Sequence, residues 1–157
     1  MTRKIATAAA ILMGAFFLSA TSLAQDHTPD DSTESLYERL GGLMPISVVV
    51  GDFIDALVPD PRMNENPAIN EARKRVPAPY LKYQVTAFVC VATGGPCDYT
   101  GRGMPESHAH LNITEQEWDR MMTIFKEVLA RHNVPDRESQ ELVELLGTTK
   151  EAIVTAG

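Results

Sequence analysis

The fold is decided by the stretch Ser35-Leu-Tyr-Glu-Arg-Leu-Gly41-Gly42, followed by an apolar segment that starts at Pro45. The residues before the paired glycines predict a short helix over 35–40. Glycine ends it because it adopts the left-handed conformation of a helix terminus at little cost. Proline suits the first turn of the next helix, which ends at Pro59-Asp-Pro61. The apolar residues of this second helix recur at helical spacing: Ile46, Val49, Val50, Phe53 and Leu57.

A third helix is predicted over 81–93. It ends at Gly94-Gly95-Pro96, a combination that cannot continue a helix. The stretch before it, 62–79, contains three prolines and little periodicity. We therefore expect a loop there, with a turn or two of helix at 68–75.

The region after the third helix, 97–105, is rich in glycine and proline and is expected to be irregular, with a brief helix around 105–110. The sequence Thr114-Glu115-Gln116-Glu117 is a capping box, in which the threonine and the second glutamate satisfy the first free backbone amides of a helix. The helix behind it presents a broad apolar stripe: Trp118, Met121, Met122, Phe125, Val128 and Leu129.

The last helix is predicted to open at Pro135-Asp136, after Asn133 ends the one before it, and to continue to Ile153 near the C-terminus. No alternation typical of a strand extends over a useful length, and no internal repeat occurs. The sequence therefore predicts one all-α domain over residues 35–155, with about four main helices and an irregular connection on each side of the third.

Residues 1–24 are typical of a secretory signal peptide. Arg3 and Lys4 form the charged start, an apolar stretch follows, and small residues end at Ala24. An uncleaved membrane anchor is the alternative, but the apolar run of 14 residues from Ile5 to Leu18 is short against the roughly 20 that span a bilayer. We expect cleavage after Ala24, a periplasmic or secreted protein, and a disordered acidic leader over 25–34.

The charge of the chain limits its partners. Its formal net charge is −7. Loss of Arg3 and Lys4 with the signal peptide would make the mature chain −9. Binding of nucleic acid or of an anionic membrane needs clustered Lys and Arg. We therefore expect neither nucleic acid nor, after signal cleavage, a membrane as a partner.

Two cysteines, Cys90 and Cys97, lie seven positions apart across a Gly-Gly-Pro turn. An oxidising compartment would permit a disulfide between them, and two free thiols are the alternative. No Cys-x-x-Cys-His motif occurs, so covalent attachment of a c-type haem is not expected.

Gln84 lies in the middle of an apolar face of the third helix. At 100° per residue the members of this face fall close together around the axis: Tyr80, Leu81, Gln84, Ala87, Phe88 and Val91. A buried amide without a partner is costly, about 1–3 kcal/mol. Its partner could be a backbone group, another side chain, water or a bound ligand.

Two histidines, His108 and His110, follow the irregular segment. Imidazole is a common ligand of iron and zinc, but two histidines alone are weak evidence for a site, and surface or capping roles are the alternative. Without further ligands at suitable spacing, a closed zinc site is not expected.

Four motifs occur in order along the chain. They are Ser35 to Gly42, Val48-Val-Val-Gly-Asp-Phe53, the helix of Gln84 ending in Gly94-Gly-Pro, and Tyr99-Thr-Gly-Arg-Gly-Met104 with His108 four residues on. In this order and at this spacing, the chain from about 35 to 155 resembles the group 1 truncated haemoglobins. The resemblance implies a two-on-two helical sandwich that holds haem b.

The same resemblance implies roles for single residues. His108, in preference to His110, would bind the haem iron, and Met104 would pack on the haem from the same side. On the other side, Phe53 would line the pocket and Gln84 would donate a hydrogen bond to a bound gas molecule. Tyr80 would be a second donor, and Tyr83 would be an internal sixth ligand. Leu81 and Phe88 would line the cofactor. Many members of the family carry a tyrosine where this chain has Ile54.

The function expected from this resemblance is reversible binding of oxygen, nitric oxide or carbon monoxide at a haem, for transport or storage. Donors aimed at a charged ligand from a dry pocket act more strongly than in water. The alternatives are nitric oxide dioxygenation or weak peroxidase activity with an unidentified redox partner, and a haem-free sensor or interaction module.

Overall fold

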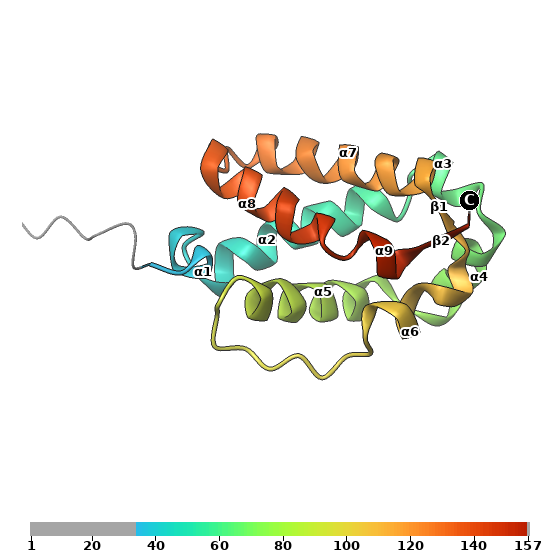
Figure 1. Ribbon diagram of the computed structural model, residues 1–157, viewed down its shortest axis with the longest axis horizontal. Coiled ribbons are helices and arrows are strands. Elements are labelled where there is room, and N and C mark those ends of the chain that lie inside the picture. Colours follow the sequence, from blue (N-terminus) through green and yellow to red (C-terminus); the bar gives the residue numbers. More distant parts are fainter. Residues whose placement is uncertain (1–33, 157) are drawn as a thin grey trace, which may run out of the picture.

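The computed structural model describes residues 34–156 (Figure 1), so the expected signal peptide at 1–24 and nearly all of the 25–34 leader lie outside the described residues. In chain order the elements are α1 (Leu36–Arg39), α2 (Leu43–Leu57), α3 (Pro61–Asn64), α4 (Pro67–Arg75), α5 (Ala78–Ala92), α6 (Met104–His108), the 3-10 helix η1 (Ala109–Leu111), β1 (Ile113–Thr114), α7 (Glu115–Arg131), α8 (Asp136–Gly147), α9 (Lys150–Ile153) and β2 (Val154–Ala156). None of the described helices is long and apolar enough to cross a membrane.

The four main helices form two packed pairs, as expected for an all-α two-on-two sandwich. Helix α2 packs on α5 and on α7, and α7 packs on α8. In Figure 1, α5 and α7 lie on opposite sides of α2. The rings of Phe53 on α2 and Phe125 on α7 meet edge to face, with their centroids 5.3 Å apart. This contact joins the two pairs at the centre of the molecule.

The short α1 and the paired glycines form as the sequence predicts. Ser35 and Glu38 make a capping box at the start of α1. Gly41 and Gly42 have φ of 83° and 84°, in the left-handed region that other residues rarely occupy. Helix α2 then begins at Leu43, whose amide donates to the Tyr37 hydroxyl.

The proline-rich stretch before α5 is more helical than expected. Instead of a loop with a turn or two, it contains both α3 and α4. Each helix starts with a proline that follows a capping side chain, because Asp60 and Asn66 accept hydrogen bonds from the first free backbone amides. Pro79 lies inside the first turn of α5, where its missing amide costs nothing.

The C-terminal part departs from the sequence prediction in two ways. The prediction of a single last helix is wrong, because α8 ends at Gly147 and a separate short α9 follows. The hydroxyls of Thr148 and Thr149 donate to the carbonyls of Leu145 and Leu146, which offers the backbone an alternative to the helix. In addition, β1 and β2 form a parallel pair that is too short to leave a pattern in the sequence.

Two buried clusters form the core. The larger lies among α2, α7 and α8 and consists of Ile46, Val50, Phe53, Ile54, Ile124, Phe125, Val128, Leu129 and Leu142. The smaller lies near the β pair and consists of Met63, Ile69, Ile113, Trp118 and Ile153. Met104, at the start of α6, packs against this smaller cluster. Helix α6 is thereby fixed to the C-terminal end of the domain.

Removal of the Asp60 carboxylate is expected to destabilise the domain in a pH-dependent way. Two nitrogens of Arg120 donate to this buried carboxylate at 2.7 and 3.0 Å. Hydrogen bonding from Arg120 holds the pKa of Asp60 below its ordinary value of 3.8. The stabilisation is therefore present above that value and is lost as the pH falls through the lowered pKa. Urea unfolding should show Asp60→Asn less stable than the wild type at pH 7, with a smaller difference at pH 3.

Glu71→Gln is the matched control for this comparison. It removes the carboxylate of an exposed pair with Lys74, and exposed pairs contribute little. An equal loss of stability in both variants, or a difference for Asp60→Asn that does not change with pH, would contradict the role of the buried pair.

Candidate functional site

Helix α5 has one face in the core and a second face that the core does not cover. Leu81, Val85 and Val89 pack against the larger cluster. Tyr80 and Val91 lie on the other face and are 54% and 43% exposed. These two side chains make this face of α5 a candidate binding surface.

Gln84 lies on this open face, one turn after Tyr80. Its Nε2 donates to the Tyr80 hydroxyl at 2.9 Å. Its Oε1 is buried and has no hydrogen-bond partner among the described residues. A half-turn of the amide exchanges the two atoms. The tyrosine hydroxyl then donates to Oε1, and the amide N–H groups take the buried position. Either way, one polar atom of Gln84 needs a partner that residues 34–156 do not supply.

His108 ends α6, and one of its ring nitrogens is already engaged. Its Nδ1 lies 2.9 Å from the carbonyl oxygen of Met104. A carbonyl only accepts, so Nδ1 carries the proton. Burial lowers the pKa of His108 below its ordinary value of 6.5, and the nearby His110 and Arg102 lower it further. The imidazole is therefore neutral at pH 7. Its Nε2 has a free lone pair and no hydrogen-bond partner among residues 34–156.

This arrangement is typical of a metal-ligating histidine. Such a histidine almost always donates its other ring N–H to a carbonyl or carboxylate, which fixes the tautomer and the ring orientation. His110, in contrast, is exposed and lies in η1. In the part of the chain that the structure describes, no group of three His, Cys, Asp or Glu side chains could hold a metal ion by itself. Any metal at His108 would need further ligands from outside these side chains.

The other expected site residues lie in different surroundings. Phe53 is part of the larger core cluster, and Leu81 packs against the same cluster rather than on the open face. Met104 supplies the carbonyl that orients His108. Tyr83 is 62% exposed and lies about 100° around α5 from Gln84. Among the described residues, Tyr83 makes no hydrogen bond to Tyr80 or Gln84, so it is not part of the bonded pair that they form.

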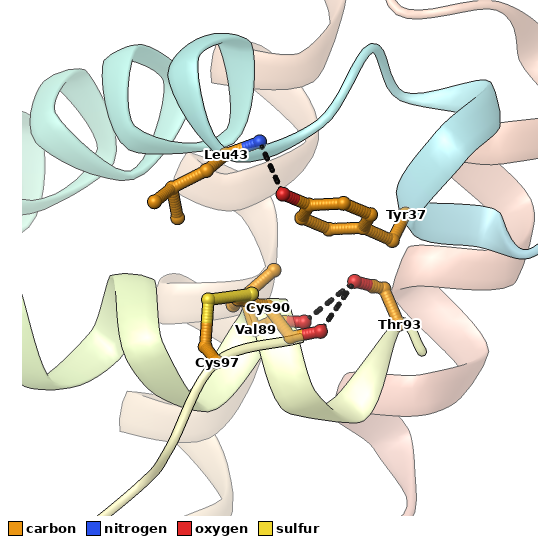
Figure 2. The surroundings of a disulfide bond; sticks show 6 residues. All are labelled: Tyr37, Leu43, Val89, Cys90, Thr93 and Cys97. Carbon is orange, nitrogen blue, oxygen red and sulfur yellow. Dashed lines mark hydrogen bonds between the residues drawn. A yellow bond between two sulfur atoms is a disulfide. The ribbon is translucent and has the colours of Figure 1, made fainter. Parts of the chain in front are cut away.

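Cys90 and Cys97 are joined by a disulfide, the bridged form of the two alternatives that the sequence left open. Figure 2 shows the bond beside Thr93, whose hydroxyl donates to the carbonyls of Val89 and Cys90 at the end of α5. The ring of Tyr37 lies close by. Sequence reasoning missed the edge-to-face contact between Phe88 and Tyr99. The two residues are eleven positions apart, so helical spacing does not reveal their contact.

Comparison with known proteins identifies the family. The model of the family described as bacterial-like globin matches residues 35–155. The chain therefore belongs to the bacterial-like globin family, whose members bind haem and gases. Within it, this protein is a group 1 truncated, two-on-two globin.

Two curated relatives are group 1 truncated haemoglobins. The protein of Tetrahymena pyriformis is 24% identical over 117 residues, which is 74% of this chain and 92% of the relative. The protein GlbN of Mycolicibacterium paratuberculosis (strain ATCC BAA-968 / K-10) is 27% identical over 113 residues, 72% of this chain and 76% of the relative. The resemblance thus extends over most of each protein.

Solved structures show the same fold. The Fe(III) form of the Tetrahymena pyriformis truncated haemoglobin aligns with a TM-score of 0.67 and 23% identity, covering 77% of this chain and 98% of that one. The 2/2 haemoglobin of Synechococcus sp. PCC 7002, solved in the cyanomet state with covalently attached haem, gives the same TM-score and coverage at 24% identity.

The protonation of His108 can be tested directly in haem-free protein. We expect its imidazole to carry the proton on Nδ1 at pH 7 and to titrate below 6.5, because burial opposes the charged form. Long-range nitrogen–proton correlation spectra of nitrogen-labelled protein across pH 4–8 report both properties, and the spectrum of His108→Gln assigns the resonance. A proton on Nε2, or titration above 6.5, would contradict this geometry.

Proposed function

We propose that this chain holds haem b between the open face of α5 and the end of α6, with Nε2 of His108 as the protein ligand of the iron. The observation that carries the proposal is the state of His108, which is neutral, oriented through Nδ1 and free at Nε2. The exposed Tyr80 and Val91 fit an apolar group on that face, and the unpartnered buried atom of Gln84 fits a polar ligand beside it. Non-covalent haem is favoured because the two cysteines are bonded to each other.

When bound, ferrous haem supplies an iron position that takes up one diatomic gas molecule reversibly. The chain supplies the surroundings of that position. In the flipped amide, in which the Tyr80 hydroxyl donates to Oε1, Gln84 turns an amide donor toward a polar gas ligand and Tyr80 fixes its orientation. Ile54 is fully buried and donates nothing. We therefore propose oxygen binding that depends on Gln84, with Tyr80 in support.

We also propose export of the protein, as the first 24 residues lead us to expect. The disulfide supports this proposal, because such bonds persist in oxidising compartments and are rare in a reducing cytosol.

His108→Ala is expected to remove or strongly shift the Soret band of the haem-loaded protein, because it removes the only neutral, pre-oriented imidazole of α6. His110→Ala is the matched control, since His110 is an exposed imidazole two residues away. Its spectrum should match the wild type. The measurement is the absorbance spectrum of ferric protein and of dithionite-reduced protein with and without carbon monoxide. Equal effects of the two substitutions, or no haem in the wild type, would refute the assignment.

Gln84→Leu is expected to speed oxygen dissociation about tenfold, because one hydrogen bond to a partly charged ligand contributes about 1.5 kcal/mol. Tyr80→Phe should have a smaller effect in the same direction, since it only frees the amide. Flash photolysis and stopped-flow mixing measure the rate. Carbon monoxide, a weaker acceptor, should dissociate at a nearly unchanged rate from both variants.

Tyr83→Phe is the control for an exposed tyrosine of α5 that makes no hydrogen bond to Gln84 among the described residues, and it should leave both rates unchanged. If Gln84→Leu changes the oxygen and carbon monoxide rates equally, the amide acts by its volume rather than as a donor.

A further inference from the structure

The helix of Gln84 and the helix of His108 are joined by residues 93–103, which we call the 93–103 connection. It contains no helix or strand. Helix α6 packs mainly on α9 and η1, whereas α5 packs mainly on α2. Direct packing therefore does little to fix α6 relative to α5. Figure 1 shows that the 93–103 connection returns along the length of α5 before it enters α6.

The first attachment of this connection to α5 is the disulfide. Cys90 is fully buried in the last turns of α5, and its Cα lies 5.9 Å from that of Cys97. The chain can turn back this sharply because Gly94 has φ of 89° and the amides of Gly94 and Gly95 bond to the carbonyls of Val91 and Cys90. The chain also passes close to α1. A Cβ at Gly95 would lie 2.5 Å from the Tyr37 ring and 2.7 Å from the Cys90 sulfur.

The second attachment is aromatic and follows two residues later. The ring of Tyr99 meets Phe88 of α5 edge to face, with centroids 5.7 Å apart. The Tyr99 hydroxyl donates to the carbonyl of Arg102 at 2.8 Å, which bends the chain toward α6. A Cβ at Gly101 would lie 2.4 Å from the Tyr99 ring, so the chain folds closely over the aromatic side chain. Only residues 100–103 separate Tyr99 from the start of α6.

We propose that Cys90, Cys97 and Tyr99 are positioning residues that hold the segment carrying His108 at a fixed place beside α5, and that haem retention depends on them. The proposal rests on the haem site described under the proposed function. None of the three side chains need touch the haem. The disulfide and the ring contact act by restricting the conformations open to the 93–103 connection, so that His108 meets the iron without a further loss of chain entropy.

The test compares Cys97→Ser and Tyr99→Ala with the wild type. We expect haem loss to an excess of a haem-scavenging apoprotein to be about tenfold faster in each variant, because each frees the segment that presents His108. Tyr99→Phe keeps the ring contact and should lose haem at a rate between those of the wild type and Tyr99→Ala. Leu142→Ala is the matched control, because it removes a buried side chain of α8, outside this connection. It should lower the melting temperature yet leave the rate of haem loss within about twofold.

A second measurement does not depend on haem. Hydrogen exchange of the haem-free protein should be faster at the amides of 98–111 in Cys97→Ser and unchanged in α7. Equal acceleration in α7, or equal haem loss from Leu142→Ala, would mean that the disulfide only stabilises the whole fold, and the proposal would be wrong. Unchanged rates in Cys97→Ser would also overturn it. If the wild type binds no haem, the proposed function fails, while hydrogen exchange still decides whether the disulfide holds the segment.

Discussion

The left-handed turn at Gly94 is the constraint on which the His108 side of the molecule depends. It ends α5 with two backbone hydrogen bonds and reverses the chain. Next to this turn, the amide of Tyr37 donates to the carbonyl of Thr93, and its hydroxyl accepts from the amide of Leu43 at the start of α2. Tyr37 thus links α1 to the end of α5 and to α2. A residue with a side chain at Gly94 would have to adopt a strained conformation.

The candidate site combines two groups that are incomplete in different ways. Among residues 34–156, Gln84 has a buried polar atom without a partner, and His108 has a free nitrogen whose ring is already oriented. Buried polar atoms in folded proteins are nearly always satisfied, so this atom supports the proposal that a ligand binds beside Gln84. The neutral state of His108 also supports a bound ligand, because burial disfavours the imidazolium and leaves the imidazole available to a metal.

Local patterns in the sequence predict most of the fold, and tertiary contacts explain what they miss. The capping box at Thr114 and the apolar stripe behind it predict α7 because both depend on residues within a few positions. The break between α8 and α9 and the pairing of Ile113 with Val154 depend on distant segments. At the site, helical spacing places Tyr80 and Gln84 together. It cannot choose between His108 and His110, since that choice depends on burial and on a bond to Met104.

The parallel pair of β1 and β2 has a practical consequence for work with this protein. Val154 pairs with Ile113, which lies only five residues after His108. The last described residues therefore pair with the segment that directly follows α6 and η1. A purification tag or a fluorescent reporter joined at that end is attached to a structural strand. Such a fusion needs a flexible spacer, whereas α1, at the start of the described chain, lies at the opposite end of the molecule from the β pair (Figure 1).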